Sequence, residues 1–145
     1  MPTSESTSLV ARRSRLGALP DDLLEEVFSD ATELHLTPPG ILHAEGGPPF
    51  TGLVTEGLVR VVVSSPDGRQ ATIRYAASGA LLGVSSLFSD AHIPVSGVPL
   101  RVSTVVMLRP NLLRDLAKRE PLVAASLMGE LAERVMEYQA ELLGS

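Results

Sequence analysis

The sequence predicts a mainly β domain, a roll of short strands flanked by helices, followed by one long C-terminal helix. Between residues 32 and 108, short apolar runs alternate with clusters of Gly, Pro, Asp and Ser, which is typical of an all-β barrel or roll. After Pro110 the apolar residues return at helical spacing. A length of 145 residues fits one domain, and with three Phe, two Tyr and no Trp its core must be aliphatic.

The composition excludes several functional classes. The chain has no cysteine, which excludes a disulfide framework, a cysteine-ligated metal cluster and a thiol nucleophile. A net charge of −5 argues against nucleic-acid binding through bulk electrostatics. No apolar run reaches the roughly 18 residues of a transmembrane helix, and the first ten residues lack the apolar segment of a secretory signal. We therefore expect a soluble, cytoplasmic domain with no membrane partner.

The N-terminal region predicts a flexible arm over residues 1–14 and then a short helix. The arm is polar and rich in Ser and Thr, as frayed termini are. Pro20 lies near the start of the helix, and the acidic Asp21 and Asp22 that follow favour its positive end. Apolar residues then recur at helical spacing, and we expect the helix to end near Asp30.

The strands of the roll are predicted next, in chain order. Each is a short apolar or alternating run bounded by turn residues. The predicted strands are Thr32–Leu36, Ile41–Ala44, Phe50–Thr55, Leu58–Val63, Arg69–Ala76, Ala80–Val84 and Leu100–Leu108. The strongest hairpin signal, Ser65-Pro66-Asp67-Gly68, joins the fourth and fifth strands. We expect one helical turn at Ser85–Ser89 and a loop at Asp90–Gly97.

Two helices are predicted after the roll, a short one at Asn111–Arg119 and a long one from Pro121 to Leu143. The long helix carries a stripe that can dock it on the roll, made of Val123, Leu127, Leu131, Val135 and Leu142. A second stripe has the spacing of a heptad seam and is made of Leu122, Ala125, Gly129, Ala132, Met136, Gln139 and Leu143. Because one stripe is enough for docking, we expect the seam to form a parallel homodimer. The alternative is a single broad buried face in a monomer.

The chain resembles a known family in its turn segments, all of which contain Gly or Pro. The segments concerned are Thr37–Leu42, Glu45-Gly46-Gly47, Val54–Val61, Pro66-Asp67-Gly68, Gly79-Ala80-Leu81-Leu82-Gly83 and Arg109–Leu113. In this order they resemble the cyclic-nucleotide-binding domain of the cyclic-AMP receptor protein/fumarate-nitrate regulator (CRP/FNR) transcription regulators, over Leu19–Leu143. The resemblance implies a double-stranded β-helix, or jelly roll, that senses an effector over residues 15–120. It also implies a dimerisation helix over residues 121–145 and a role in transcription regulation rather than catalysis.

The phosphate-binding cassette is where this sequence departs from that family. Members that bind cyclic nucleotides have a Glu after the second Gly of the cassette and, further on, an Arg that holds the cyclic phosphate. Here Val84 follows Gly83, and the arginine position falls on Pro94, which Val95 follows. Burying a phosphate without a cation is unfavourable. We therefore expect a small, less polar effector, with cyclic AMP and cyclic GMP bound weakly or not at all. The alternative is a structural dimerisation domain with an empty pocket.

The alignment to this family also gives the candidate ligand-binding residues. They are Arg74, Gly83, Val84, Ser85, Ser86, Pro94, Val95, Ser96, Tyr138 and Gln139. Together they predict a mostly apolar pocket in which the serines supply hydroxyl groups. Arg74 is the candidate cation, with a place on the outer surface of its strand as the alternative. Tyr138 and Gln139 fall where the family's long helix reaches the ligand and the partner subunit.

Metal, haem and hydrolase chemistry have less support. His35, His43 and His92 show no metal-ligand spacing to one another, so we expect no cofactor and no metal. Ser86, Asp90 and His92 are close in sequence, but no nucleophile elbow surrounds the serine, so we expect no catalytic residues and no enzyme.

DNA binding would need a module outside this sequence. Regulators of the resembled family continue from the long helix into a winged helix-turn-helix, and the acidic last helix cannot act as a recognition helix. We expect either the sensor fragment of a longer regulator or a stand-alone domain.

Overall fold

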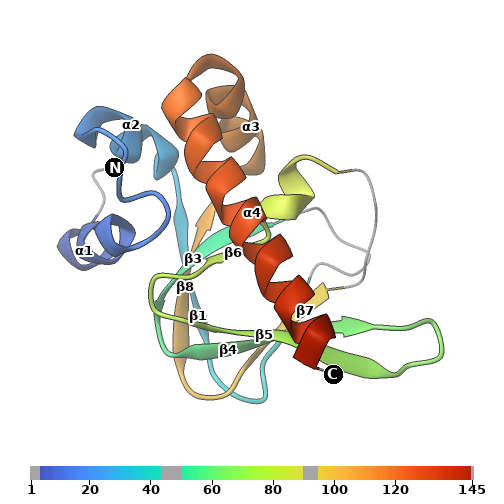
Figure 1. The fold of residues 1–145 in the computed structure, drawn as a ribbon. Helices are drawn as coiled ribbons and strands as arrows, with labels where there is room; N and C mark the ends of the chain where they lie inside the picture. Colours follow the sequence, from blue (N-terminus) through green and yellow to red (C-terminus); the bar gives the residue numbers. More distant parts are fainter. Residues whose placement is uncertain (1–3, 44–49, 90–94, 145) are drawn as a thin grey trace.

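The computed structural model describes residues 4–43, 50–89 and 95–144, and it shows a roll of two antiparallel sheets with helices gathered at one end (Figure 1). The first sheet has the order β1-β8-β3-β6, made of Thr32–Leu36, Ser103–Leu108, Thr51–Glu56 and Leu81–Leu82. The second has the order β2-β7-β4-β5, made of Leu42–His43, Val95–Pro99, Leu58–Ser64 and Gln70–Ala77. The predicted jelly roll is confirmed.

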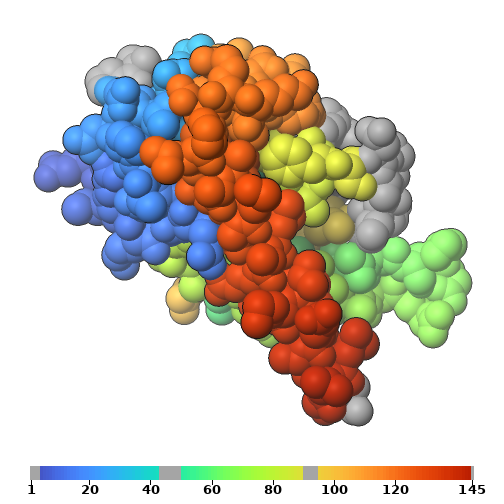
Figure 2. Space-filling view, turned by 45° about the horizontal axis from the view of Figure 1, so that its top comes forward, coloured from blue at the N-terminus to red at the C-terminus, as the bar shows by residue number. Residues whose placement is uncertain are grey.

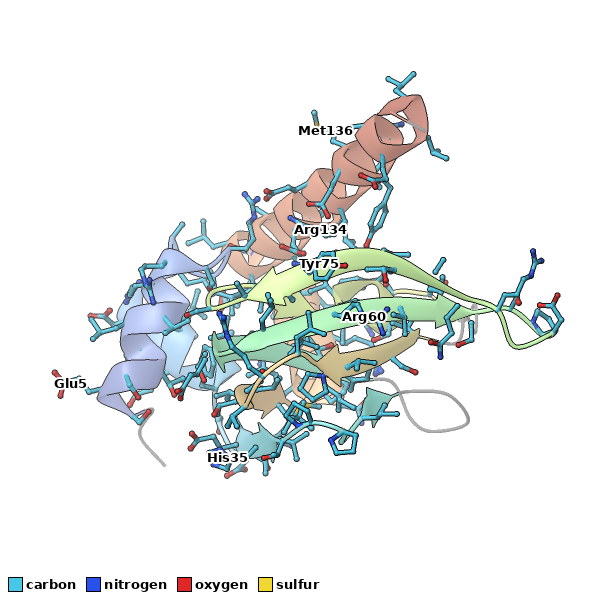
Figure 3. All side chains as sticks on the ribbon, turned by 90° about the horizontal axis from the view of Figure 1, so that it is seen from below. Glu5, His35, Arg60, Tyr75, Arg134 and Met136 are labelled. Carbon is cyan, nitrogen blue, oxygen red and sulfur yellow. The ribbon has the colours of Figure 1, made fainter. Side chains whose placement is uncertain are left out.

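The helices are α1 (Glu5–Arg13), α2 (Asp21–Val27), the 3-10 helix η1 (Val84–Leu87), α3 (Pro110–Arg119) and α4 (Pro121–Gly144). The predicted short helices at α2 and α3, the helical turn at η1 and the long C-terminal helix are all confirmed. In Figure 1 α4 runs from beside α3 across the front of the roll, and Figure 3 shows its C-terminal end rising away from the sheets. No helix among the described residues combines the length and the apolar character that crossing a membrane requires.

The hairpin between β4 and β5 forms where the sequence placed it. The register runs from Leu58 opposite Ala77 to Ser64 opposite Gln70. The Ser65 N–H donates to the Arg69 carbonyl at 2.8 Å and closes the turn. Gly68 has φ +87°, a conformation that only glycine adopts without strain, which explains the Pro-Asp-Gly signal.

The N-terminal segment differs from the flexible arm that we expected over residues 1–14. Glu5–Arg13 is helix α1, and the Ser4 side chain caps it by accepting from the Thr7 N–H. Val10 and Ala11 are buried against the core at the helical end of the roll. The segment folds because one side of this otherwise polar helix is apolar, a stripe that the Ser/Thr-rich composition concealed.

The loop expected at residues 90–97 is also partly wrong. Val95–Pro99 forms strand β7, which pairs with both β2 and β4. Gly and Pro lower the strand propensity of this segment, and the hydrogen bonds available between two neighbouring strands override it. The last strand begins at Ser103 rather than Leu100. Residues 90–94, including Pro94, and the turn expected at 45–47 lie outside the described residues.

The core is aliphatic, as the composition predicts. The largest fully buried side chains are all Leu or Val: Leu16, Leu19, Leu53, Leu81, Leu113, Leu116, Leu127, Val27, Val54, Val59, Val62 and Val105. One buried cluster joins the helices to the end of the roll, and a second lies between the two sheets. The first cluster holds the N-terminal half of α4 in place.

Helix α4 is docked at its beginning and exposed at its end. Val123 and Leu127 are buried in the helical cluster, and Leu131 packs against it, as the docking stripe predicts. Leu142, at the end of that stripe, is 76% exposed. Figure 2 shows this end of α4 projecting from the body of the molecule.

The predicted heptad seam of α4 lies on the surface of the single chain. Leu122, Met136 and Leu143 are among its exposed large apolar side chains. Met136 lies on the side of α4 turned away from the sheets (Figure 3). Gly129 is the exception, because a Cβ built on it would lie 3.4 Å from Cδ of Arg15 in the same chain. The seam is therefore available to a partner except where Arg15 covers Gly129.

Candidate functional site

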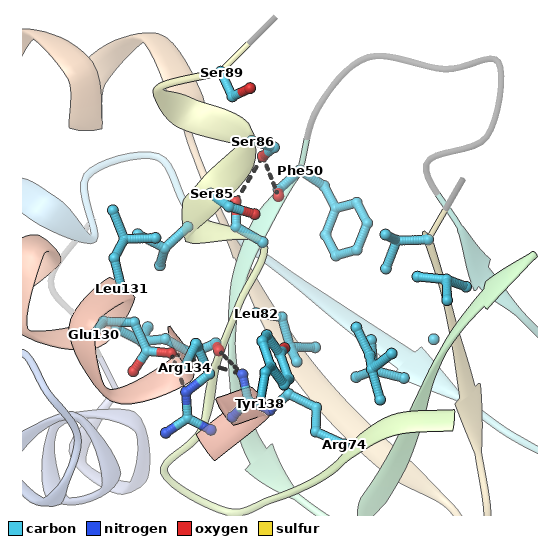
Figure 4. A pocket seen from close by; sticks show the side chains of 18 of the residues that line it. Phe50, Arg74, Leu82, Ser85, Ser86, Ser89, Glu130, Leu131, Arg134 and Tyr138 are labelled. Atoms are coloured by element: carbon cyan, nitrogen blue, oxygen red, sulfur yellow. Dashed lines mark hydrogen bonds and ion pairs between the residues drawn. The ribbon is translucent and has the colours of Figure 1, made fainter. Parts of the chain in front are cut away.

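A cavity of about 370 Å³ lies between the second sheet, η1 and α4 (Figure 4). This volume falls in the range of small-molecule sites, about 300–1,000 Å³. The lining residues are Phe50, Val61, Val63, Ile73, Arg74, Leu81, Leu82, Gly83, Val84, Ser85, Ser86, Ser89, Val95, Ser96, Gly97, Glu130, Leu131, Arg134, Val135 and Tyr138. The roll thus supplies one side of the cavity and α4 the other.

Most of the ligand-binding residues expected from the sequence meet at this cavity. It is lined by Arg74, Gly83, Val84, Ser85, Ser86, Val95, Ser96 and Tyr138. Pro94 lies outside the described residues. Gln139 is exposed and does not line the cavity, because successive residues of a helix point about 100° apart and Tyr138 occupies the inward position. Whether these residues bind a ligand stays a prediction.

The position of Arg74 depends on an irregularity in the β4–β5 hairpin. Val61 pairs with Arg74 and Val62 pairs with Thr72, so Ile73 is an extra residue on β5, as in a β-bulge. A bulge bends the strand and redirects neighbouring side chains. Ile73 and Arg74 both line the cavity as a result. The surface alternative for Arg74 is therefore wrong, since only 10% of its side chain is exposed.

The polar part of the cavity is a cluster of buried charges, Arg74–Glu130–Arg134 (Figure 4). Arg74 Nη1 lies 3.7 Å from Glu130 Oε2 and donates to the Leu81 carbonyl at 2.9 Å. Arg134 Nε lies 3.2 Å from the same Glu130 oxygen. The side chains of Glu130 and Arg134 are only 7% and 18% exposed. This cluster ties β5 to α4 at the wall of the cavity.

Burial dominates the electrostatics of this cluster. It raises the pKa of the Glu130 carboxyl group, although Arg134 and Arg74 act in the opposite direction. Burial also lowers the pKa of Arg74, helped by the charge of Arg134 and opposed by Glu130. Burial likewise raises the pKa of the Tyr138 hydroxyl. The cluster is therefore held together by mutual attraction against a cost of desolvation.

We expect the stability conferred by Glu130 to fall as pH rises. The folded state binds the Glu130 proton more tightly than the unfolded chain does, because its folded pKa lies above the ordinary value of 4.5. The contribution is therefore fully present below about pH 4.5 and is lost as pH rises through the raised pKa. Glu130→Gln stays neutral, so its free energy of unfolding relative to wild type should increase between about pH 4 and pH 7. Urea denaturation at both pH values measures this difference.

A control for this prediction is Glu137→Gln, which removes another carboxylate bound to Arg134. Glu137 accepts from Arg134 Nη1 at 2.8 Å, but its side chain is 43% exposed. An equal pH dependence in this variant would contradict the assignment of the effect to burial of Glu130.

Glu130 and Arg134 are the functional candidates that sequence reasoning missed. In the sequence, the acidic character of the last helix argues only against DNA recognition, and the structure shows that Glu130 is buried. The signal that identifies them is spacing, since Glu130, Arg134 and Tyr138 follow one another at four-residue intervals and share a helix face. An acidic and a basic residue four positions apart are also the usual pattern of an exposed ion pair on a helix. The spacing alone therefore does not distinguish a buried pair from an exposed one.

The histidines considered for a metal lie apart from the cavity lining or outside the described side chains. His35 Nδ1 lies 3.2 Å from the Thr104 hydroxyl, on the pair β1–β8. His92 and the side chain of His43 are not among the parts that the structure describes.

Comparisons with known proteins agree with this architecture. The family described as the cyclic nucleotide-binding domain matches residues 34–120, more than half of the chain. No curated protein sequence matches it. Among solved structures, the N-terminal domain of a transcriptional regulator from Streptomyces coelicolor A3(2) is 27% identical, with a TM-score of 0.67. The alignment covers 92% of this chain and 94% of that one.

Two longer proteins share the fold. The Thermus thermophilus catabolite activator protein is 25% identical with a TM-score of 0.70, over 88% of this chain and 61% of its own. A putative transcriptional regulator of the CRP/FNR family from Eubacterium rectale is 14% identical with a TM-score of 0.72, over 83% of this chain and 57% of its own. This chain thus spans less than two thirds of either regulator. The match over residues 34–120 and these structures confirm the resemblance, and the chain belongs to the cyclic nucleotide-binding domain family with the fold of CRP/FNR transcription regulators.

Proposed function

We propose that this chain is the effector-sensing and dimerisation domain of a CRP/FNR-type transcription regulator, with an effector other than a cyclic nucleotide. In this proposal residues 15–120 form the sensing roll and residues 121–145 the dimerisation helix. DNA is reached only through a module outside these residues, and the protein works in the cytoplasm without catalysing a reaction. The observation that carries the proposal is the cavity shared by the roll and α4. A bound molecule would contact both parts at once.

The composition of the cassette disfavours a cyclic nucleotide, although Arg74 and Arg134 line the same cavity. Val84 lines the cavity and is buried, so the position where nucleotide-binding relatives hold a ribose hydroxyl has no acceptor side chain. The segment Asp90–Pro94, where those relatives place the phosphate-binding arginine, contains neither Lys nor Arg. Burying a ribose hydroxyl beside valine leaves it unpartnered, at a cost of about 1–3 kcal/mol.

Transmission through α4 follows from the composition of the lining. Leu131, Val135 and Tyr138 all belong to α4, whereas Val61, Ile73 and Ser96 belong to the opposing strands. A molecule that fills the space between them stabilises one distance between α4 and the sheet. Ligands change a conformational equilibrium only through such differential contacts.

We expect cyclic AMP and cyclic GMP to show no micromolar binding in titration calorimetry. Each charged hydrogen bond that the cassette lacks is worth about 1.5–3 kcal/mol, so the loss of the arginine and the glutamate lowers affinity by several tenfold steps. A library of small metabolites should instead contain compounds that raise the melting temperature, because a ligand selective for the folded state stabilises it.

The matched variants for this experiment are Ser96→Phe and Ser64→Phe. Ser96 lines the cavity on β7, so a phenyl group there fills it and should abolish the ligand-dependent rise in melting temperature. Ser64, on neighbouring β4, does not line the cavity, and its variant should respond as wild type does. Micromolar binding of either cyclic nucleotide would contradict the proposal.

The second candidate function is a structural dimerisation domain whose pocket stays empty. The exposed heptad seam of α4 favours it, since large apolar side chains such as Met136 and Leu143 need no ligand in order to pair. Under this alternative no compound of the library raises the melting temperature. Both candidates share the parallel homodimer through Leu122, Ala125, Gly129, Ala132, Met136, Gln139 and Leu143.

We expect Met136→Glu to weaken self-association. Met136 is 68% exposed in the single chain, and a pair of glutamates facing each other in the seam would repel in an apolar contact. Sedimentation velocity measures the change in mass. The control Leu9→Glu replaces an exposed leucine of α1 outside the seam and should leave the mass unchanged. A monomeric wild type at tens of micromolar would contradict the homodimer.

A further inference from the structure

Arg74 is the less compensated of the two cations in the Arg74–Glu130–Arg134 cluster, because it lies 3.7 Å from Glu130 whereas Arg134 contacts Glu130, Glu133 and Glu137 at 2.8–3.3 Å. Among the described lining residues, Arg74 and Arg134 are the cations and Glu130 is the anion. Glu133 and Glu137 also contact Arg134, but their side chains are 51% and 43% exposed and neither lines the cavity. These contacts compensate Arg134 from the solvent side, so the lining cation that can take a negative charge from a ligand is Arg74.

The same cluster presents a buried donor without an acceptor. In the described chain, Nε of Arg74 and Nε of Arg134 are the buried side-chain polar atoms that have no hydrogen-bond partner, but Arg134 Nε has the Glu130 carboxylate 3.2 Å away as an ion pair, which leaves Arg74 Nε as the donor without an acceptor. Arg74 is nine-tenths buried, and its Nη1 already donates to the Leu81 carbonyl. An unpartnered buried donor on a charged group is unfavourable, so an added acceptor at this place would stabilise the folded state.

The remainder of the cavity wall is mainly apolar, with Ser85, Ser86, Ser89, Ser96 and Tyr138 as its polar side chains. Val61, Ile73 and Leu82 lie on the sheet side, and Leu131 and Val135 on the side of α4. These side chains cannot satisfy the hydroxyl groups and ring nitrogens of a nucleotide or sugar, whereas they favour a hydrocarbon body by removing it from water. The wall thus combines one anion-binding end with a mainly apolar interior.

We propose that the effector of this cavity is a small organic carboxylate with an apolar body, whose carboxylate binds Arg74 in competition with Glu130. The inference rests on the proposed sensing function, and it names the class of molecule sensed. A guanidinium donates to a carboxylate through paired N–H groups, which is the strongest common recognition of that anion in proteins.

Competition with Glu130 gives the binding a direct effect on α4. Glu130 belongs to α4 and Arg74 to β5, so their ion pair of 3.7 Å joins the helix to the roll. A carboxylate that takes over Arg74 weakens this connection and replaces it with contacts to the ligand. Ligand binding at the cluster therefore changes the contacts that hold α4 on the roll.

The test is titration calorimetry of the whole chain with carboxylates from butanoate to decanoate and phenylacetate, each compared with its primary amide. We expect carboxylates to bind at least about tenfold more tightly than the matching amides, as one charged hydrogen bond implies. Arg74→Gln should remove this preference. Arg60→Gln is the matched control, because Arg60 lies on neighbouring β4, outside the cavity lining, where it donates to Thr72.

Glu130→Gln should change carboxylate affinity in the opposite direction to Arg74→Gln, and this distinguishes a loss of recognition from a loss of folding. It removes the competing anion, so carboxylates should bind more tightly and amides as before, whereas a damaged cavity would weaken both. Equal affinity for carboxylates and amides, or no carboxylate binding at millimolar concentration, overturns the inference; if amides or other neutral compounds still bind, the proposed function survives. Micromolar binding of cyclic AMP that Arg74→Gln abolishes would instead assign the anion site to a cyclic phosphate and overturn both.

Discussion

Replacing Gly83 by alanine should lower the free energy of unfolding by about 2–5 kcal/mol, one of the two largest single effects that we expect in this molecule. Gly83 has φ +76°, a left-handed conformation that costs a side-chain-bearing residue about 1–2 kcal/mol. A Cβ at this position would also overlap the carbonyl oxygen of Phe50 and lie 3.1 Å from its carbonyl carbon. Backbone atoms of a neighbouring segment cannot rotate away, so the chain itself must shift.

Gly79→Ala is the control for this result. Gly79 has a similarly positive φ of +98°, but a Cβ there would meet nothing within 4 Å. Its cost should be limited to the backbone term, about 1–2 kcal/mol. Chemical denaturation of the two variants separates conformational strain from steric overlap. Equal losses would show that the overlap with Phe50 is relieved without cost.

The damage from Gly83→Ala should extend to the cavity. The Gly83 carbonyl accepts from the Ser86 hydroxyl at 2.6 Å and from Thr51 Oγ1 at 3.3 Å, and these bonds set the start of η1. Val84 and Ser85, which follow in η1, line the cavity. The close approach of the Gly83 and Phe50 backbones thus determines the position of η1, which forms part of the cavity wall.

Leu127→Ala should cost about 2–5 kcal/mol, the range for removing a buried leucine side chain from a packed core. Leu127 is 1% exposed and belongs to the cluster that joins α4 to α1, α2 and α3. Its loss leaves a cavity where the docked half of α4 meets the roll. Urea denaturation of the variant gives the free energy directly.

The matched variant is Leu142→Ala on the same helix. Leu142 is 76% exposed, so its truncation should change the free energy of unfolding of the single chain by less than about 0.5 kcal/mol. A comparable loss in both variants would mean that the end of α4 is buried in solution, as a partner chain would bury it. The pair therefore tests the docking of α4 independently of the seam.

The architecture was readable from the sequence because its turns carry strong local signals. Gly57, Gly68 and Gly79 have positive φ, and each lies at a turn between two predicted strands. Gly83 also has a positive φ but fell inside the strand predicted over Ala80–Val84, which the structure ends at Leu82. These positions determine where strands end through backbone conformation, which local sequence encodes directly. Strand β7 was missed because its Gly97 and Pro99 oppose strand formation, and only pairing with distant β2 and β4 makes it a strand.

The candidate site was less predictable because it depends on packing between distant elements. Strict alternation along β5 would put Tyr75 on the same face as Ile73, yet the Tyr75 side chain is 62% exposed. The irregular pairing near Val61 and Val62, which brings Ile73 and Arg74 to the cavity together, has no local signature. Burial of Glu130 likewise follows from the docking of α4 across β5, a contact that single-sequence reasoning does not supply.

The anchoring of α4 at one end makes it a lever. Its buried residues, Val123, Leu127 and Glu130, lie in the first half of its 24 residues, and its last turns project freely. From Glu130 to Gly144 a helix rises about 21 Å, so a tilt of about 5° at the charge cluster displaces the far end by about 2 Å. A small change in the tilt of α4 at the charge cluster thereby becomes a movement of its C-terminal end that is large enough to misalign the side chains of a partner helix.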